Sequence, residues 1–195
     1  MGEAAALEPS GMAALIGADE DSANALAAAR REDGGRLWVA NVNAPGQVVV
    51  AGGAEDIEWA AANARQHGIR RVIPLKVAGA FHTPFMESAA QRLGRALAAT
   101  PVGPGAFPVY ANLTAAPYGV DVAGTLRDQL TGRVRFAESL VAMADHVDAY
   151  VHVGPGDVTA PMARRAVPGH PAVVVDGPER AGDVVSEVLA ILESA

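Results

Sequence analysis

One histidine stands out in the segment VAGAFHTPFMESAA, residues 77–90. Five apolar or glycine residues precede His82, and Thr83, Pro84 and a helical pattern follow it. Because threonine is a good N-cap and proline is favoured at the first helical position, the imidazole should lie just outside a helix N-terminus. The positive end of the helix dipole favours the neutral ring that a general base needs. The more ordinary interpretation is a partly buried histidine satisfied by hydrogen bonds, and this segment alone does not exclude it.

A nucleophile to partner this base is not visible. None of the six serines stands in a G-x-S-x-G motif, and Ser88 falls on a predicted helix surface. Cysteine is absent, which excludes thiolate nucleophiles and disulfides and fits a reducing cytosol. The other four histidines show no metal-ligand spacing, so we predict no metal site.

Two further stretches carry polar groups at turns. HVGPGDVT, residues 152–159, is a glycine turn able to present N–H groups to an anion, although a plain strand-to-helix turn is the ordinary interpretation. It lacks the G-K-[ST] of a nucleotide P-loop. VANVNAPGQVVVAG, residues 39–52, places Asn41, Asn43 and Gln47 at a turn between two apolar strands.

The charge pattern argues against nucleic acid as a partner. The net charge is −7 and Lys76 is the only lysine. No basic stripe is interleaved with aromatic residues. The arginine pairs 70–71, 133/135 and 164–165 are interpreted first as solvated surface charge, with contact to an acidic partner or a phosphate as the alternative. No apolar run reaches 18 residues, so we predict no membrane span.

The elements that must position these groups fall into two parts. Residues 11–77 read as β-α-β-β-α-β, the ferredoxin-like order, with strands at 11–17, 36–42, 47–53 and 69–77 and helices at about 19–31 and 54–67. Gly68 occupies the position of a helix C′ residue. Residues 78–195 alternate helices with three short strands at 109–112, 149–154 and 172–176, which suggests an α/β sheet with few strands.

Several motifs together resemble one family. GMAALIG, NVNAPGQVVVAG, RVIPLKVAGAFHTPFM, YANLTAAP, RDQLTGRVRFAESL and HVGPGD occur in order and at compatible spacing. The chain resembles the C-terminal two-thirds of bacterial malonyl-CoA:acyl-carrier-protein transacylases, over roughly residues 11–165. The resemblance implies an α/β-hydrolase-like acyltransferase lobe, of which 78–195 is the C-terminal portion, with the ferredoxin-like lobe at 11–77 and a residual helix end at 1–10.

The resemblance also implies an activity and roles for four residues. The family moves a malonyl group from malonyl-CoA to the phosphopantetheine thiol of acyl-carrier protein by a Ser–His ping-pong mechanism, without a cofactor, in the cytoplasm. His82 matches the catalytic histidine, and Gln129 matches the residue whose main-chain carbonyl accepts the other ring N–H. Phe81 matches a position that favours malonyl over methylmalonyl, and Asn43 matches an asparagine near the pocket.

One departure from the family pattern is large. The family's serine elbow and its carboxylate-binding arginine lie upstream of everything matched here, and Met1 looks like a methionine that shortly follows that arginine. We therefore expect a chain that begins inside a transacylase sequence, is inactive alone, and has a separately encoded N-terminal half as one potential partner. An acyltransferase of a polyketide or malonate-decarboxylase system, a non-catalytic carrier-protein-binding module and an inactive gene product remain alternatives.

Overall fold

The protein has a mixed α/β fold. A computed structural model describes residues 1–103 and 105–194, which divide into two compact units at residues 136 and 137. Within the described part of the chain, no helix combines the length and apolar character needed to cross a membrane.

An antiparallel sheet forms the centre of the first unit. The element order β-α-β-β-α-β expected for residues 11–77 is present, and the strands lie in the order β2-β3-β1-β4. Every neighbouring pair is antiparallel. The strand order places the first strand between the third and the fourth. The strands are β1 (Ser10–Ile16), β2 (Leu37–Ala44), β3 (Gln47–Gly53) and β4 (Arg71–Pro74).

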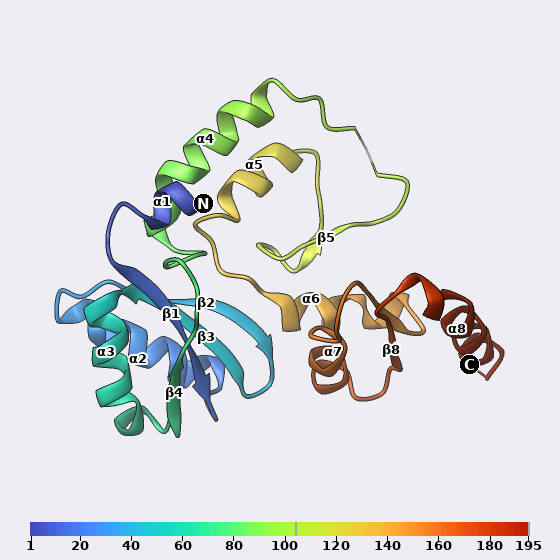
Figure 1. The fold of residues 1–195 in the computed structure, drawn as a ribbon, viewed down its shortest axis with the longest axis horizontal. Coiled ribbons are helices and arrows are strands. Elements are labelled where there is room, and N and C mark those ends of the chain that lie inside the picture. Colours follow the sequence, from blue (N-terminus) through green and yellow to red (C-terminus); the bar gives the residue numbers. More distant parts are fainter. Residues whose placement is uncertain (104, 195) are drawn as a thin grey trace. The chain divides into compact units, whose positions relative to one another are not determined.

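Two helices, α2 (Glu20–Glu32) and α3 (Ala54–Asn63), pack beside each other against this sheet (Figure 1). The Asp19 side chain caps α2 by accepting a hydrogen bond from the Ser22 backbone N–H. A 3₁₀ turn, η1 (Ala64–His67), continues α3 and ends at Gly68, which has φ +76°. Glycine adopts this left-handed conformation without a steric penalty, so the predicted end of the helix is confirmed.

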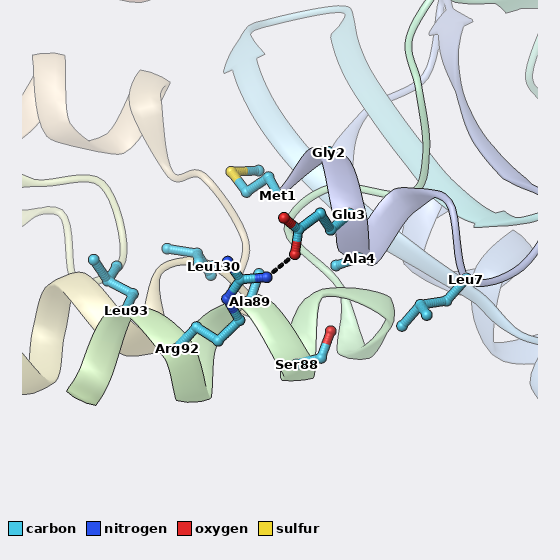
Figure 2. Close-up of a pocket in the computed structure, with 10 residues that line it drawn as sticks. All are labelled: Met1, Gly2, Glu3, Ala4, Leu7, Ser88, Ala89, Arg92, Leu93 and Leu130. Atoms are coloured by element: carbon cyan, nitrogen blue, oxygen red, sulfur yellow. Dashed lines mark hydrogen bonds and ion pairs between the residues drawn. The ribbon is translucent and has the colours of Figure 1, made fainter. Parts of the chain in front are cut away.

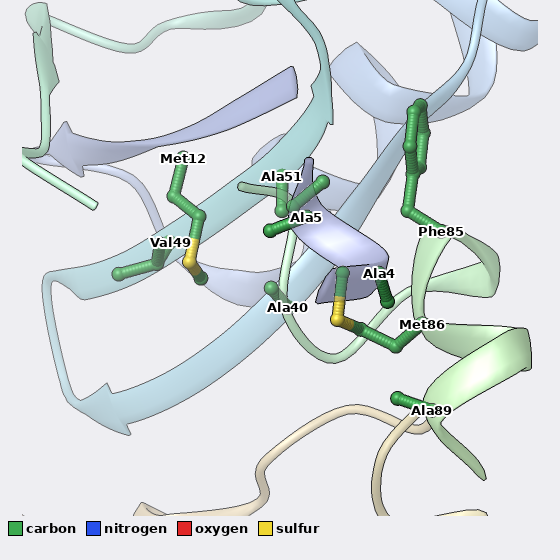
Figure 3. Packing of buried hydrophobic residues seen from close by; sticks show 10 residues of the cluster. Ala4, Ala5, Met12, Ala40, Val49, Ala51, Phe85, Met86 and Ala89 are labelled. Carbon is green, nitrogen blue, oxygen red and sulfur yellow. The ribbon is translucent and has the colours of Figure 1, made fainter. Parts of the chain in front are cut away.

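The opposite face of the sheet carries the core that supports the candidate site. Met12, Ala40, Val49 and Ala51 project from the strands and meet Ala4 and Ala5 of α1 (Gly2–Ala5) together with Ala80, Phe85, Met86 and Ala89 (Figure 3). Because side chains alternate across a strand, Ala13, Leu15 and Val50 point to the other face and are fully buried there. The sheet is therefore covered on both faces, which makes it a rigid base for the loop that follows β4.

The fourth strand is shorter than the predicted 69–77. Pro74 is its last residue. The chain then turns, with the Leu75 N–H donating to the Met12 carbonyl and the Val77 N–H to the Leu75 carbonyl.

The rest of the first unit is helical apart from one small hairpin. A 3₁₀ turn, η2 (Pro84–Met86), runs into α4 (Glu87–Ala98), which packs against α5 (Val122–Asp128). Between them, β5 (Tyr110–Ala111) pairs with β6 (Ala116–Pro117). The strand predicted at 109–112 is thus only two residues long, and the prediction that it joins a sheet with 149–154 and 172–176 is wrong for the described residues. The chain reverses tightly at Ala115, φ +54°, and β5 pairs with its own return strand.

The second unit is a small parallel pair of strands with helices. β7 (Tyr150–Val153) pairs with β8 (Ala172–Val175), and α7 (Ala160–Ala166) connects them. The unit also contains η3 (Ala144–His146), η4 (Pro178–Arg180), α8 (Ala181–Ser194) and all of α6 (Phe136–Met143) except its first residue. The glycine turn at 152–159 leads into α7. Within this turn, the His152 Nδ1 and Thr159 Oγ1 atoms are 2.5 Å apart.

Candidate active site

The loop between β4 and η2 holds His82 in a defined conformation. The Ala80 N–H donates to Ser10 Oγ at 3.2 Å, so the first residue of β1 holds the loop. Gly79 is required beside it because a Cβ there would lie 2.6 Å from the Ala5 Cβ. His82 has φ +60°, an uncommon value for a residue with a side chain. Such a conformation persists only where its surroundings determine it.

Thr83 fixes the loop from the other side, as the sequence predicts. It is fully buried, its hydroxyl donates to the Ala80 carbonyl at 2.6 Å, and it accepts from the Phe85 N–H at 3.3 Å. It is the N-cap of η2, and Pro84 stands in the first turn. The helix start therefore carries His82 at its N-terminal edge.

Gln129 meets the histidine ring across 47 residues of sequence. It follows α5 as its C-cap, and its main-chain carbonyl lies 3.1 Å from His82 Nδ1. A carbonyl oxygen can only accept, so Nδ1 carries the hydrogen of this bond and the Nε2 lone pair stays available. Among the residues that the structure describes, Gln129 supplies the one hydrogen bond to the ring. This arrangement can orient a general base.

Phe81 and Asn43, the two predicted pocket residues, are placed differently in the structure. Phe81 is half-buried and packs against the core cluster, as do Trp38 and Leu130. Asn43 is half-buried near the end of β2, where the pairing with β3 is irregular. Asn43 makes no hydrogen bond to His82 or Gln129, so its place at a pocket stays a prediction.

The segment after Gln129 makes contacts that the sequence analysis did not predict. Arg133 was first interpreted as solvated charge, but its guanidinium binds Glu20 and Asn24 of α2. Val134 forms a parallel bridge with Asn41 of β2. More than 100 residues separate Arg133 from its partners, and no local pattern in the sequence could have identified them.

An open hollow of about 850 Å³ lies between α1 and α4 (Figure 2). A Glu3–Arg92 ion pair bridges it, and Ser88 and Leu130 are among its lining residues. His82, Phe81 and Gln129 do not line it. Ser88 is exposed on α4, as expected, and gives His82 no hydroxyl contact. The hollow is therefore not by itself the place where the histidine acts.

Comparison with known proteins identifies the relatives of this arrangement. No family model matches the chain. It is 32% identical over 182 residues to the malonyl CoA-acyl carrier protein transacylase of Bacillus subtilis, covering 92% of this chain and 57% of that protein. The structure matches the acyl-carrier-protein S-malonyltransferase of Burkholderia pseudomallei with a TM-score of 0.89 at 30% identity, over 95% of this chain and 61% of that one.

The chain is a homologue of the malonyl CoA-acyl carrier protein transacylases.

A third match is a type II PKS acyl-carrier protein in complex with its malonyl-transacylase. Its TM-score is 0.86 at 28% identity, covering 91% of this chain and 59% of that one. This transacylase homologue thus spans about three-fifths of the length of the relatives it matches. The matches extend over both compact units, because they cover more than nine-tenths of the chain.

Proposed function

We propose that this chain supplies the general base for transfer of a malonyl group from malonyl-CoA to the phosphopantetheine thiol of an acyl-carrier protein. The observation that carries the proposal is the His82 Nδ1 to Gln129 carbonyl contact of 3.1 Å. It orients an imidazole whose Nε2 can take a proton from a nucleophile. The similarity to transacylases supports the same assignment.

The first half-reaction forms an ester. A serine hydroxyl attacks the malonyl thioester carbon while its proton moves to His82 Nε2. The Gln129 carbonyl, at the negative end of α5, stabilises the imidazolium that forms. The carbon–sulfur bond then breaks, and the CoA thiolate leaves with the proton that His82 returns.

The second half-reaction repeats these steps in reverse. The pantetheine thiol gives its proton to His82, its sulfur attacks the malonyl ester, and the serine oxygen leaves and takes that proton back. One thioester replaces another, so the balance needs no oxidant, reductant or cofactor.

The nucleophile is proposed to come from polypeptide outside these 195 residues, together with an arginine that binds the malonyl carboxylate in a bidentate pair. We infer a ferredoxin-like lobe at 11–77, and the β2-β3-β1-β4 sheet order supports it. Residues 78–195 would then be part of an α/β-hydrolase-like lobe. On this proposal the chain alone does not transfer malonyl groups.

Two side chains are proposed to shape the acyl pocket. Phe81 precedes the base and packs against the core cluster. Its bulk would fill the space that an extra methyl group needs. Asn43 is proposed to lie near the same pocket. A fatty-acid carrier protein and a polyketide carrier protein are both candidate acceptors, and the match to a type II PKS carrier complex favours testing the second beside the first.

The test is malonyl transfer to each carrier protein by this chain, with and without the N-terminal segment of a transacylase relative. We expect transfer only with the segment, and a fall of roughly 10²- to 10⁴-fold in kcat for His82→Gln at unchanged carrier affinity. Phe81→Ala in the same assay should raise transfer from methylmalonyl-CoA relative to malonyl-CoA.

Three outcomes would contradict the proposal. Transfer by the chain alone would mean that one of its six serines is the nucleophile. A folded complex that binds carrier protein without transfer would support the carrier-binding module. Unchanged turnover of His82→Gln would show that His82 is not the base.

A further inference from the structure

The side chain of Gln129 closes a turn around its own carbonyl. Its Nε2 donates to the Gly132 carbonyl at 2.9 Å and to the Arg133 carbonyl at 3.3 Å. The same residue presents its main-chain carbonyl to His82 Nδ1. The orientation of that carbonyl therefore depends on where the Gly132 and Arg133 carbonyls are held.

Arg133 is anchored on α2, which packs against the face of the sheet opposite the core that supports the candidate site. Its guanidinium donates to the Glu20 carboxylate and, at 2.7 Å, to Asn24 Oδ1. Glu20 and Asn24 stand four residues apart on α2, so they form one face of that helix and receive both arms of the planar fork. The Arg133 side chain is 30% exposed.

Backbone pairing holds the next residue. The Val134 N–H donates to the Ala40 carbonyl and the Val42 N–H donates to the Val134 carbonyl, both at 2.8 Å. These bonds fix the segment beside β2. The Arg133 carbonyl, which accepts from Gln129, belongs to the same planar peptide group as the Val134 N–H. The guanidinium contacts therefore add a second restraint at the Arg133 end of this peptide.

We propose that Arg133 is a positioning residue for His82. Held by Glu20 and Asn24, it keeps its own carbonyl on the Gln129 side-chain amide, and this in turn keeps the Gln129 main-chain carbonyl on His82 Nδ1. The effect on the histidine tautomer follows from the geometry alone, whereas its effect on turnover rests on the proposed malonyl transfer.

The tautomer is measured on the full chain by nitrogen NMR of the imidazole, with His82→Gln used to assign the signal. All variants are compared at one alkaline pH. Arg133→Gln should lower the ratio of Nδ1–H to Nε2–H tautomers at His82 roughly two- to fivefold, as expected for a partly exposed ion pair. Arg133→Lys keeps one charged contact, so its tautomer ratio should lie between that of the unmodified chain and that of Arg133→Gln.

Arg127→Gln is the matched control. Arg127 is an exposed arginine of α5 that pairs with its neighbour Asp128 and makes no contact with α2. The His82 tautomer ratio should not change in this variant. Glu20→Gln should reproduce the effect of Arg133→Gln, and the double variant should add little to either, because both remove the same contact.

An unchanged tautomer ratio in Arg133→Gln, or an equal change in Arg127→Gln, would overturn the proposal. If Arg133→Gln does not fold, Asn24→Ala and Glu20→Gln each weaken the same contact and decide the question.

Turnover provides a separate readout. In the malonyl-transfer assay with the added segment, Arg133→Gln should lower kcat with little change in KM for malonyl-CoA, and Arg133→Lys should restore part of it. Absence of transfer when the chain without substitutions is combined with the added segment would reject the proposed function, while the NMR comparison would still decide whether Arg133 positions His82.

Discussion

At the scale of single residues, the site depends on side chains that hold backbone rather than on reactive groups alone. Thr83 makes two buried hydrogen bonds on either side of His82, and Gln129 contributes both a carbonyl and a side-chain amide. The positive φ of His82 is maintained by these contacts. A base with a fixed ring orientation needs such support because each contact limits rotation of the loop or the ring.

Thr83→Val tests this support directly. Valine has nearly the same shape but leaves the buried Ala80 carbonyl and Phe85 N–H without the hydroxyl. We therefore expect a loss of roughly 1–3 kcal/mol in the free energy of unfolding. Urea unfolding followed by tryptophan fluorescence reports on the first compact unit, since both tryptophans, Trp38 and Trp59, lie in it.

Thr100→Val is the control, because the Thr100 hydroxyl donates to the Ala96 carbonyl at an exposed helix end. Its cost should stay within about 0.5 kcal/mol. Equal losses in the two variants would show that burial of the Thr83 hydroxyl has no special importance.

At the scale of elements, caps determine where helices begin and therefore where functional residues stand. Thr83 starts η2 beside His82, and Asp19 starts α2, which carries the partners of Arg133. The pKa of Asp19 is lowered by hydrogen bonds from the Ser22 hydroxyl and then from the Ser22 backbone N–H. Protonation of this carboxylate should weaken the helix on which Arg133 is anchored.

Asp19→Asn separates capping from charge. The folded pKa of Asp19 lies below its unfolded value of about 3.9, so its charge stabilises the fold above about pH 4 and this contribution is lost as the pH falls through the folded pKa. Asparagine also caps well but does not titrate. The difference in unfolding free energy between the two proteins should therefore shrink on acidification, measured by urea unfolding at neutral and acidic pH.

Asp21→Asn is the control, because this exposed carboxylate stands in the same helix turn without the capping bond. A pH dependence of equal size in both variants would assign the effect to the charge of the turn and not to the cap.

At the scale of the whole molecule, the two compact units differ in how well they bury apolar side chains. The sheet of the first unit is covered on both faces. In the second unit, Val151 and Leu189 line an apolar groove of about 280 Å³ between β7, β8 and α8, and both are about half exposed. A two-stranded sheet offers too little surface to cover such residues.

This groove should bind the apolar dye ANS in the native protein. Val151→Lys and Leu189→Lys together should lower ANS fluorescence, whereas Leu75→Lys, an exposed leucine of the first unit that does not line the groove, should not. If the unmodified protein, the double variant and Leu75→Lys give the same ANS fluorescence, the dye binds elsewhere.

The sequence alone determined the local parts of this protein. Thr83 and Pro84 mark the helix start beside His82, Gly68 marks a helix end, and apolar alternation predicts the β-α-β-β-α-β order, because caps and periodicity depend on neighbours within a few residues. Resemblance to a family suggested Gln129 as the partner of His82. Only the tertiary structure decided that their atoms meet at 3.1 Å, that Arg133 reaches Glu20, and that β5 pairs with β6. These contacts join residues whose separation along the chain carries no periodic signal, or depend on the path of a tight turn, so they exist only once the sheet has brought the segments together.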